Sequence, residues 1–219
     1  MRLSRKVLAI VGASTLLVGT VAAPAMADST VPIYGGRTEI TTTAKVLHNL
    51  TAAGILMKGT NGASSVIIRK GGEARQQFTF SVTTPSKLTL EDNPIGGTVG
   101  AVTGGKVTHT GTIRVLNTNN GKVMKFGDFV VNFDRMKVFA RSINGDMVDP
   151  VAVFVVKVFD PPLVPTYNDK TAPTKARVAG IGIHLTRGAA SLLNGELNSK
   201  VFEGGMMFGK VVTVADLVK

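Results

Sequence analysis

The sequence contains no cysteine and no tryptophan. The lack of cysteine excludes disulfide bonds, thiol catalysis and thiolate metal sites, so stability has to come from strand pairing and burial. The lack of tryptophan, with only two tyrosines in 219 residues, leaves no aromatic platform on which nucleic-acid bases could stack. Because no nucleic-acid-binding motif is present either, we expect no nucleic-acid partner.

Catalytic motifs are also missing. No G-x-S-x-G nucleophile elbow occurs, and the serines lie in ordinary turn, strand and helix contexts. A carboxylate pair of the glycosidase type is conceivable among Asp128, Asp134, Asp146 and Asp149, but the last two flank a predicted hairpin turn, where acidic residues are expected. The histidines do not have the spacing of a metal site: His48, His109 and His184. The sequence predicts neither an enzyme nor a metal centre, with an extracellular hydrolase as an alternative.

The first 27 residues have the pattern of a secretory signal peptide. Basic residues precede an apolar stretch from Val7 to Ala23, and the small residues of Ala25-Met26-Ala27 suit signal peptidase. We therefore place cleavage before Asp28 and predict a secreted or extracellular protein with no transmembrane span after cleavage. An uncleaved anchor helix is the alternative, although the apolar run is short for a membrane span.

The remaining chain is basic. Three of the 25 basic residues lie in the signal peptide, which leaves 22 against 14 acidic residues and a net charge of +8 for residues 28–219. The charges are scattered singly, as on solvated strand faces. A net positive charge nevertheless attracts the protein to anionic surfaces, and anionic cell-wall polymers or the envelope surface are the expected partners.

The stretch from Gly104 to Ile143 predicts consecutive antiparallel strands. Val107, His109 and Gly111 alternate with threonines, a period of two that places alternate side chains on opposite faces of a sheet. Asn119-Asn120-Gly121 and Asn144-Gly145 suit hairpin turns because Asn and Gly tolerate positive φ. The β-branched and aromatic run that follows, 148–159, extends the meander.

Two short helices are expected beside these strands. Thr41-Thr42-Thr43 offers N-cap hydroxyls to a helix over 44–53, and Leu185-Thr186 leads into a helix over 189–197. Aligning Thr41 with Thr186 gives a weak internal echo of strand, capped helix and strand. The predicted fold is mainly β, an antiparallel β-sandwich with two short helices.

Residues 28–219 are expected to form a single β-rich domain, since 192 residues suffice for one core. A proline-rich connection at 160–173 interrupts the pattern. Loops of this length are uncommon inside a domain, and we favour a partly extended crossover, with a domain boundary as the alternative. Tyr167, within this connection, either packs the loop onto the sheet or rims a binding groove.

Several turn and core motifs resemble those of one family. They are Gly105-Lys106-Val107-Thr108-His109-Thr110-Gly111-Thr112-Ile113, Gly127-Asp128-Phe129-Val130-Val131, Val138-Phe139-Ala140, and Leu185-Thr186 with Ala189-Ala190 and Leu193-Asn194. They look like those of the small secreted actinobacterial proteins related to the HtaA-type conserved-region domain. The resemblance covers most of residues 28–219 and implies a β-rich sandwich with short helices.

Some members of that family bind haem at the cell surface, with a tyrosine as axial ligand and a histidine in support. A phenolate is a sound ligand for ferric iron. The resemblance therefore implies haem as an alternative cofactor, with Tyr34 or Tyr167 as ligand and His109 as a further contact.

Three functional hypotheses follow. The leading one is a secreted, non-catalytic structural or adhesive β-sandwich module that associates with the cell envelope and needs no cofactor. The first alternative is a haem-binding surface or secreted module, and the second is an extracellular hydrolase.

Overall fold

The structure is a computed structural model that describes residues 28–91, 100–159, 162–169 and 173–218. The predicted signal peptide lies outside these ranges, as do parts of the proline-rich connection and residues 93–97, where Asn, Pro and Gly in the sequence predict a loop. In the described part of the chain, neither helix is long and apolar enough to cross a membrane.

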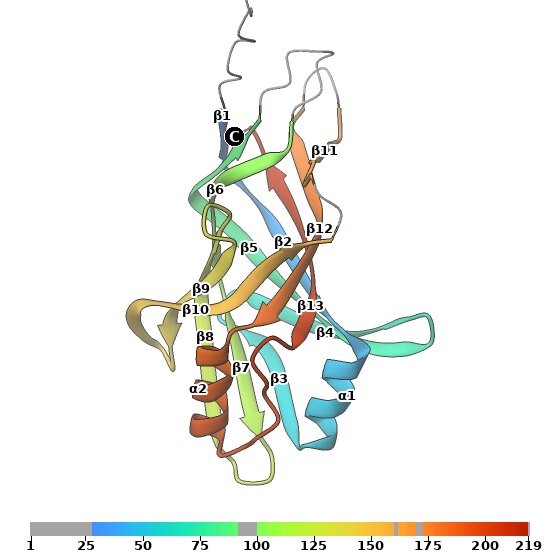
Figure 1. The fold of residues 1–219 in the computed structure, drawn as a ribbon, viewed down its shortest axis with the longest axis vertical. Helices are drawn as coiled ribbons and strands as arrows, with labels where there is room; N and C mark the ends of the chain where they lie inside the picture. Colours follow the sequence, from blue (N-terminus) through green and yellow to red (C-terminus); the bar gives the residue numbers. More distant parts are fainter. Residues whose placement is uncertain (1–27, 92–99, 160–161, 170–172, 219) are drawn as a thin grey trace, which may run out of the picture.

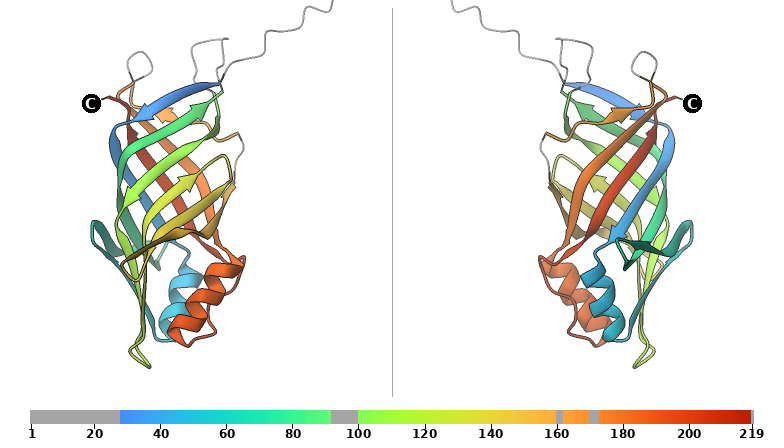
Figure 2. Two further views of the ribbon diagram at one scale, coloured as in Figure 1. Left: turned by 90° about the vertical axis from the view of Figure 1, so that its left-hand side faces the viewer. Right: turned by 90° about the vertical axis from the view of Figure 1, so that its right-hand side faces the viewer.

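Eight strands form a closed antiparallel barrel (Figures 1 and 2). Going round it, each strand is hydrogen-bonded to the next in the order β5, β2, β13, β12, β10, β9, β8 and β6. Strand β6 pairs with both β8 and β5, which closes the ring. The bounds are β2 (Gly35–Thr42), β5 (Glu73–Leu90), β6 (Val102–Thr110), β8 (Val123–Asn132), β9 (Lys137–Ile143), β10 (Asp146–Val158), β12 (Lys175–Leu185) and β13 (Met207–Asp216).

The prediction of a mainly β fold with two short helices is confirmed, but the strands close into a barrel instead of stacking as the two sheets of a sandwich. Both architectures produce the same alternation of inward and outward side chains, so the period of two does not distinguish them. The ring closes because β6 pairs with β5 on one side and with β8 on the other. At Gly111, whose φ is 118°, the chain leaves the ring and continues as β7 (Thr112–Asn117).

The barrel is filled by side chains. Along β5, Phe78, Phe80 and Val82 point inward and are buried, whereas Thr79 and Ser81 between them face outward. The Phe80 ring meets the Phe129 ring edge to face, with centroids 5.4 Å apart. A barrel of eight strands is just wide enough for its interior to be packed in this way.

A sheet extension continues below the barrel. The first half of β8 pairs with β7, and β7 pairs with β3 (Ile55–Thr60), while the second half of β8 remains in the barrel. The two helices, α1 (Ala44–Ala52) and α2 (Arg187–Leu197), lie at this lower end (Figure 2). Strand β3 is not among the predicted strands.

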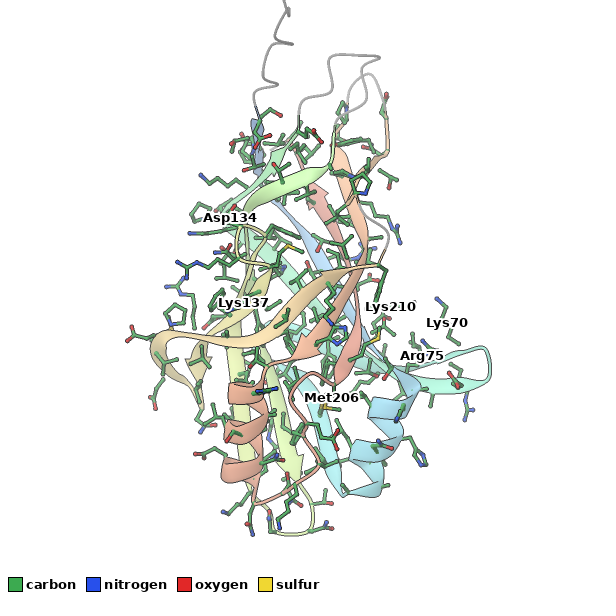
Figure 3. The ribbon with its side chains drawn as sticks, viewed as in Figure 1. Lys70, Arg75, Asp134, Lys137, Met206 and Lys210 are labelled. Carbon is green, nitrogen blue, oxygen red and sulfur yellow. The ribbon has the colours of Figure 1, made fainter. Side chains whose placement is uncertain are left out.

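Three further strands pair with strands of the barrel. β1 (Ser29–Ile33) and β4 (Ala63–Lys70) both pair with β5, and β11 (Thr166–Tyr167) pairs with β12. The hairpin of β4 and the start of β5 projects from the body, and Lys70 and Arg75 lie on it (Figure 3). Part of the proline-rich connection is therefore extended along β12.

Both helices begin at a threonine N-cap. The Thr43 hydroxyl accepts from the Val46 amide at 3.2 Å, and the Thr186 hydroxyl accepts from the Ala189 amide at 3.1 Å. This satisfies one of the amides that the first turn of a helix leaves unpaired. The prediction of two capped helices is confirmed, with α2 beginning two residues earlier than expected.

Replacing either cap by alanine is expected to lower the free energy of unfolding by about 1 kcal/mol. Thr186→Ala should cost more than Thr43→Ala, because the Thr186 hydroxyl also donates to the Ala152 carbonyl at 2.7 Å. Urea unfolding followed by circular dichroism measures both values. The serine variants, which keep the hydroxyl, are the controls; losses as large in serine as in alanine would contradict the capping role.

Candidate functional site: a cationic row and an adjoining groove

The residues predicted to contact haem lie in separate places. Tyr34 follows β1 and lines a surface pocket with Lys175 and Asp216. Tyr167 is half-buried in β11, and burial raises the pKa of its hydroxyl, which disfavours the phenolate. His109 lies inside the barrel and is only 2% exposed.

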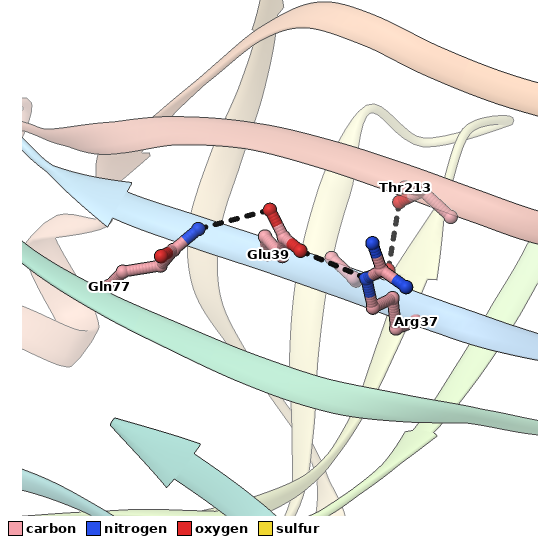
Figure 4. A network of polar contacts seen from close by, with 5 residues as sticks. Arg37, Glu39, Gln77 and Thr213 are labelled. Atoms are coloured by element: carbon pink, nitrogen blue, oxygen red, sulfur yellow. Dashed lines mark hydrogen bonds and ion pairs between the residues drawn. The ribbon is translucent and has the colours of Figure 1, made fainter. Parts of the chain in front are cut away.

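His109 belongs to a buried hydrogen-bond chain. Its Nε2 lies 2.7 Å from the Thr38 hydroxyl, which lies 2.8 Å from the Thr213 hydroxyl, and its Nδ1 lies 3.3 Å from the Phe129 carbonyl. Burial lowers the pKa of the imidazole to about 4, so it is neutral at pH 7. Because a carbonyl only accepts, Nδ1 carries the proton, Nε2 accepts from Thr38, and Thr38 accepts from Thr213. Figure 4 shows the bond from Thr213.

The space beside His109 is small. The enclosed cavity has a volume of about 20 Å³, and its other lining residues are apolar apart from Thr38. Such a cavity holds about one water molecule, whereas sites for organic ligands measure roughly 300–1,000 Å³. In this conformation the barrel does not fit haem, and the geometry brings neither tyrosine to His109. Haem ligation by these residues stays a prediction.

The aspartates considered for hydrolysis have local structural roles or lie on exposed hairpins. Asp134 accepts a hydrogen bond from the Gly105 amide at 2.8 Å, and Asp128 adopts a positive φ of 52° where β8 passes from the extension into the barrel. Asp146 and Asp149 are exposed on the β9–β10 hairpin. Across the described ranges, no group of three or more histidine or acidic side chains is placed to hold a metal ion.

Three cations lie in register on the outer face of the sheet extension. Lys58 of β3 is directly opposite Arg114 of β7, and Arg114 is directly opposite Lys125 of β8. Each is flanked along its strand by buried residues, so all three side chains point outward. At about 4.8 Å between strands, this cationic row is roughly 10 Å long.

The cationic row has no acidic partner. Three ion pairs occur in the described part of the chain, and none includes Lys58, Arg114 or Lys125. Arg114 and Lys125 are also only partly exposed. Like charges opposite one another on neighbouring strands destabilise a sheet, so an arrangement of this kind favours the binding of an anion that relieves the repulsion.

Positive charges also lie close to one another on neighbouring strands of the barrel wall. Lys87 of β5 is opposite Lys106 of β6, and Lys157 and Lys210 lie on either side of Gly182. Strand β2 is the contrast, because the Glu39 carboxylate lies between Arg37 and Gln77 and bonds to both (Figure 4). The charge of Arg37 is therefore neutralised on β2, whereas Lys87, Lys106, Lys157 and Lys210 form none of the three ion pairs found among the described residues.

A groove adjoins the cationic row. It lies between α1 and the β4–β5 hairpin and has a volume of about 440 Å³ beside β3 and β7. Along α1 it continues as a wider depression of about 720 Å³. We call the two parts together the α1 groove, since Leu47, Thr51 and Ile67 line both of them.

Sequence reasoning missed both features. It described the charges as scattered singly, because Lys58 and Arg114 are far apart in the chain. The burial of their neighbours indicates an outward direction for each residue, but only the strand register places one opposite the other. No local signal in the sequence carries that information.

No protein-family model and no curated protein matches this sequence. Among solved structures, the fold is similar to the crystal structure of the C-terminal domain of HtaA from Corynebacterium glutamicum, with a TM-score of 0.47 and 10% sequence identity. The match covers 86% of this chain and 99% of that domain. It is a remote likeness in fold.

Proposed function

We propose that this protein is a secreted, non-catalytic module that attaches to anionic polymers of the cell envelope through the cationic row. One observation carries the proposal: Lys58, Arg114 and Lys125 lie opposite one another on three neighbouring strands and form no ion pair with any described residue. Secretion rests on the predicted signal peptide. The net charge of +8 supplies long-range attraction, and the row supplies a local contact.

The physical basis is multivalent electrostatics on a rigid support. A polymer with repeated anionic groups can meet several cations at once, and each contact releases counterions. Because Lys58 is exposed and Arg114 and Lys125 are partly exposed, each contributes modestly, about 0.2–1 kcal/mol. Affinity should therefore depend strongly on salt and on chain length, as expected for an adhesive module.

Binding of residues 28–219 to long-chain inorganic polyphosphate tests the proposal. The triple variant Lys58→Gln, Arg114→Gln and Lys125→Gln should bind roughly 10- to 100-fold more weakly at 50 mM salt, and its salt slope should fall by about 2. Isothermal titration calorimetry at three salt concentrations measures both.

The matched control removes the same charge from separate exposed positions, as Arg141→Gln, Arg177→Gln and Lys200→Gln. It should keep most of the affinity. Equal losses in the two triple variants would show that net charge alone is responsible, and an absence of binding by the unaltered protein would remove the proposal.

A further inference from the structure

The α1 groove combines apolar walls with positively charged side chains. Leu47 of α1, Ile67 of β4 and Leu116 of β7 line it, and Ile67 is 59% exposed. Leu56 of β3 also lines it and is 49% exposed. Apolar side chains left open in a concave surface indicate a binding site more strongly than single exposed residues do.

Two members of the cationic row, Lys58 and Arg114, lie at the β3–β7 end of this groove. The residues lining that end include no carboxylate. The one acidic residue in the wider part, Glu73, is bonded to Arg75 at 2.9 Å. The groove thus has apolar side chains along its walls and two cations at its β3–β7 end, and Lys45 and His48 of α1 line its wider part.

The free edge of β3 does not offer its backbone to a peptide strand at the centre of the groove. The Gln76 side-chain amide donates to the Met57 carbonyl at 2.6 Å, and the Gly59 amide donates to the Ser65 hydroxyl at 3.0 Å. These bonds occupy the groups that an added strand would need. The groove therefore recognises a ligand through side chains.

We propose that the α1 groove binds a single-chain anionic amphiphile. Its head group lies between Lys58 and Arg114, and its hydrocarbon chain lies along Leu47, Ile67 and Leu116. The charge complementarity of the β3–β7 end selects an anionic head, and the apolar walls select the chain. This deepens the proposed function, since it rests on two cations of the same row.

Calorimetric titration with dodecyl phosphate, below its micelle concentration, tests this inference. The protein should bind dodecyl phosphate at least tenfold more tightly than inorganic phosphate, which lacks the chain, and than dodecyltrimethylammonium, which lacks the anionic head. Ile67→Ser should weaken the binding of dodecyl phosphate about tenfold.

Val66→Ser is the matched control. Val66 and Ile67 are neighbours on β4 with similar exposure, 55% and 59%, but only Ile67 lines the groove. Val66→Ser should leave the affinity for dodecyl phosphate unchanged. Equal losses in the two variants, or equal affinity for the cationic amphiphile, would overturn the inference.

Further variants separate this inference from the proposed function. Lys125 belongs to the cationic row but does not line the groove, so Lys125→Gln should weaken polyphosphate binding and leave dodecyl phosphate binding unchanged. Ile67→Ser should do the opposite. If polyphosphate binds and dodecyl phosphate does not, the groove proposal fails alone; if only dodecyl phosphate binds, the polymer proposal fails alone.

Discussion

Replacement of Phe80 by alanine should lower the free energy of unfolding by about 3–5 kcal/mol, the usual cost of removing a fully buried aromatic ring. Phe80 is 1% exposed and lies at the centre of the barrel, where it meets Phe129 edge to face. The closed ring of strands restrains the wall from collapsing into the space left behind. The loss should therefore lie at the upper end of this range.

Chemical denaturation of Phe80→Ala beside Phe159→Ala measures the effect. Phe159 is 47% exposed and covers Gly182 from outside the barrel, beneath the Lys210 ammonium, so its loss should cost less than about 1 kcal/mol. Similar losses in the two variants would mean that the barrel interior is not the main source of stability.

Acidification should destabilise the fold through His109. Its pKa is about 4 in the folded protein and about 6.5 when unfolded, so between these values the unfolded state binds a proton that the folded state does not. The contribution of neutral His109 is present above pH 6.5 and is lost as the pH falls towards 4. A difference of about 2.5 pKa units corresponds to about 3 kcal/mol.

The comparison of the unaltered protein with His109→Gln isolates this contribution, because no other titratable side chain lines the cavity beside His109. Urea unfolding at pH 7, 5.5 and 4.5 should show the stability difference between the two proteins shrinking as the pH falls. Parallel losses of stability over this range would show that His109 is not the group responsible.

The small cavities of the barrel and the closed ring of strands both bear on the proposed function. The described cavities inside the barrel are water-sized, so both proposed ligands are assigned to the outer surface and to the groove beside α1. A closed barrel has no free edges of its own. Under the proposed function, the barrel is the rigid support that keeps Lys58, Arg114 and Lys125 in register.

The internal echo is present in the structure as two units of strand, capped helix and strand, but its register differs from the predicted one. Thr43 and Thr186, and not Thr41 and Thr186, are the equivalent N-caps. With the caps aligned, the buried Val46 and Leu50 of α1 correspond to the buried Ala189 and Leu193 of α2. The positions of the N-caps and of the buried residues therefore align the two units better than matching residue types do.

Local chemistry made much of the fold predictable. The alternation along β5 and β6, the Asn-Gly turn at residues 144 and 145, and the threonine caps are short-range features, each set by a few neighbouring residues. The 18-residue length of β5 is not evident from the sequence, since Pro85 interrupts its alternating pattern.

The sequence by itself determined which side chains face inward, where the chain turns, where the helices begin, and that residues 28–219 carry excess positive charge. The tertiary structure alone decided that β6 closes the ring, that Lys58, Arg114 and Lys125 form one row, and that α1 and the β4–β5 hairpin enclose a groove. A period of two assigns a residue to a face but does not name its partner strand. Partner and register depend on contacts between residues distant in the chain, and those exist only once the barrel has closed.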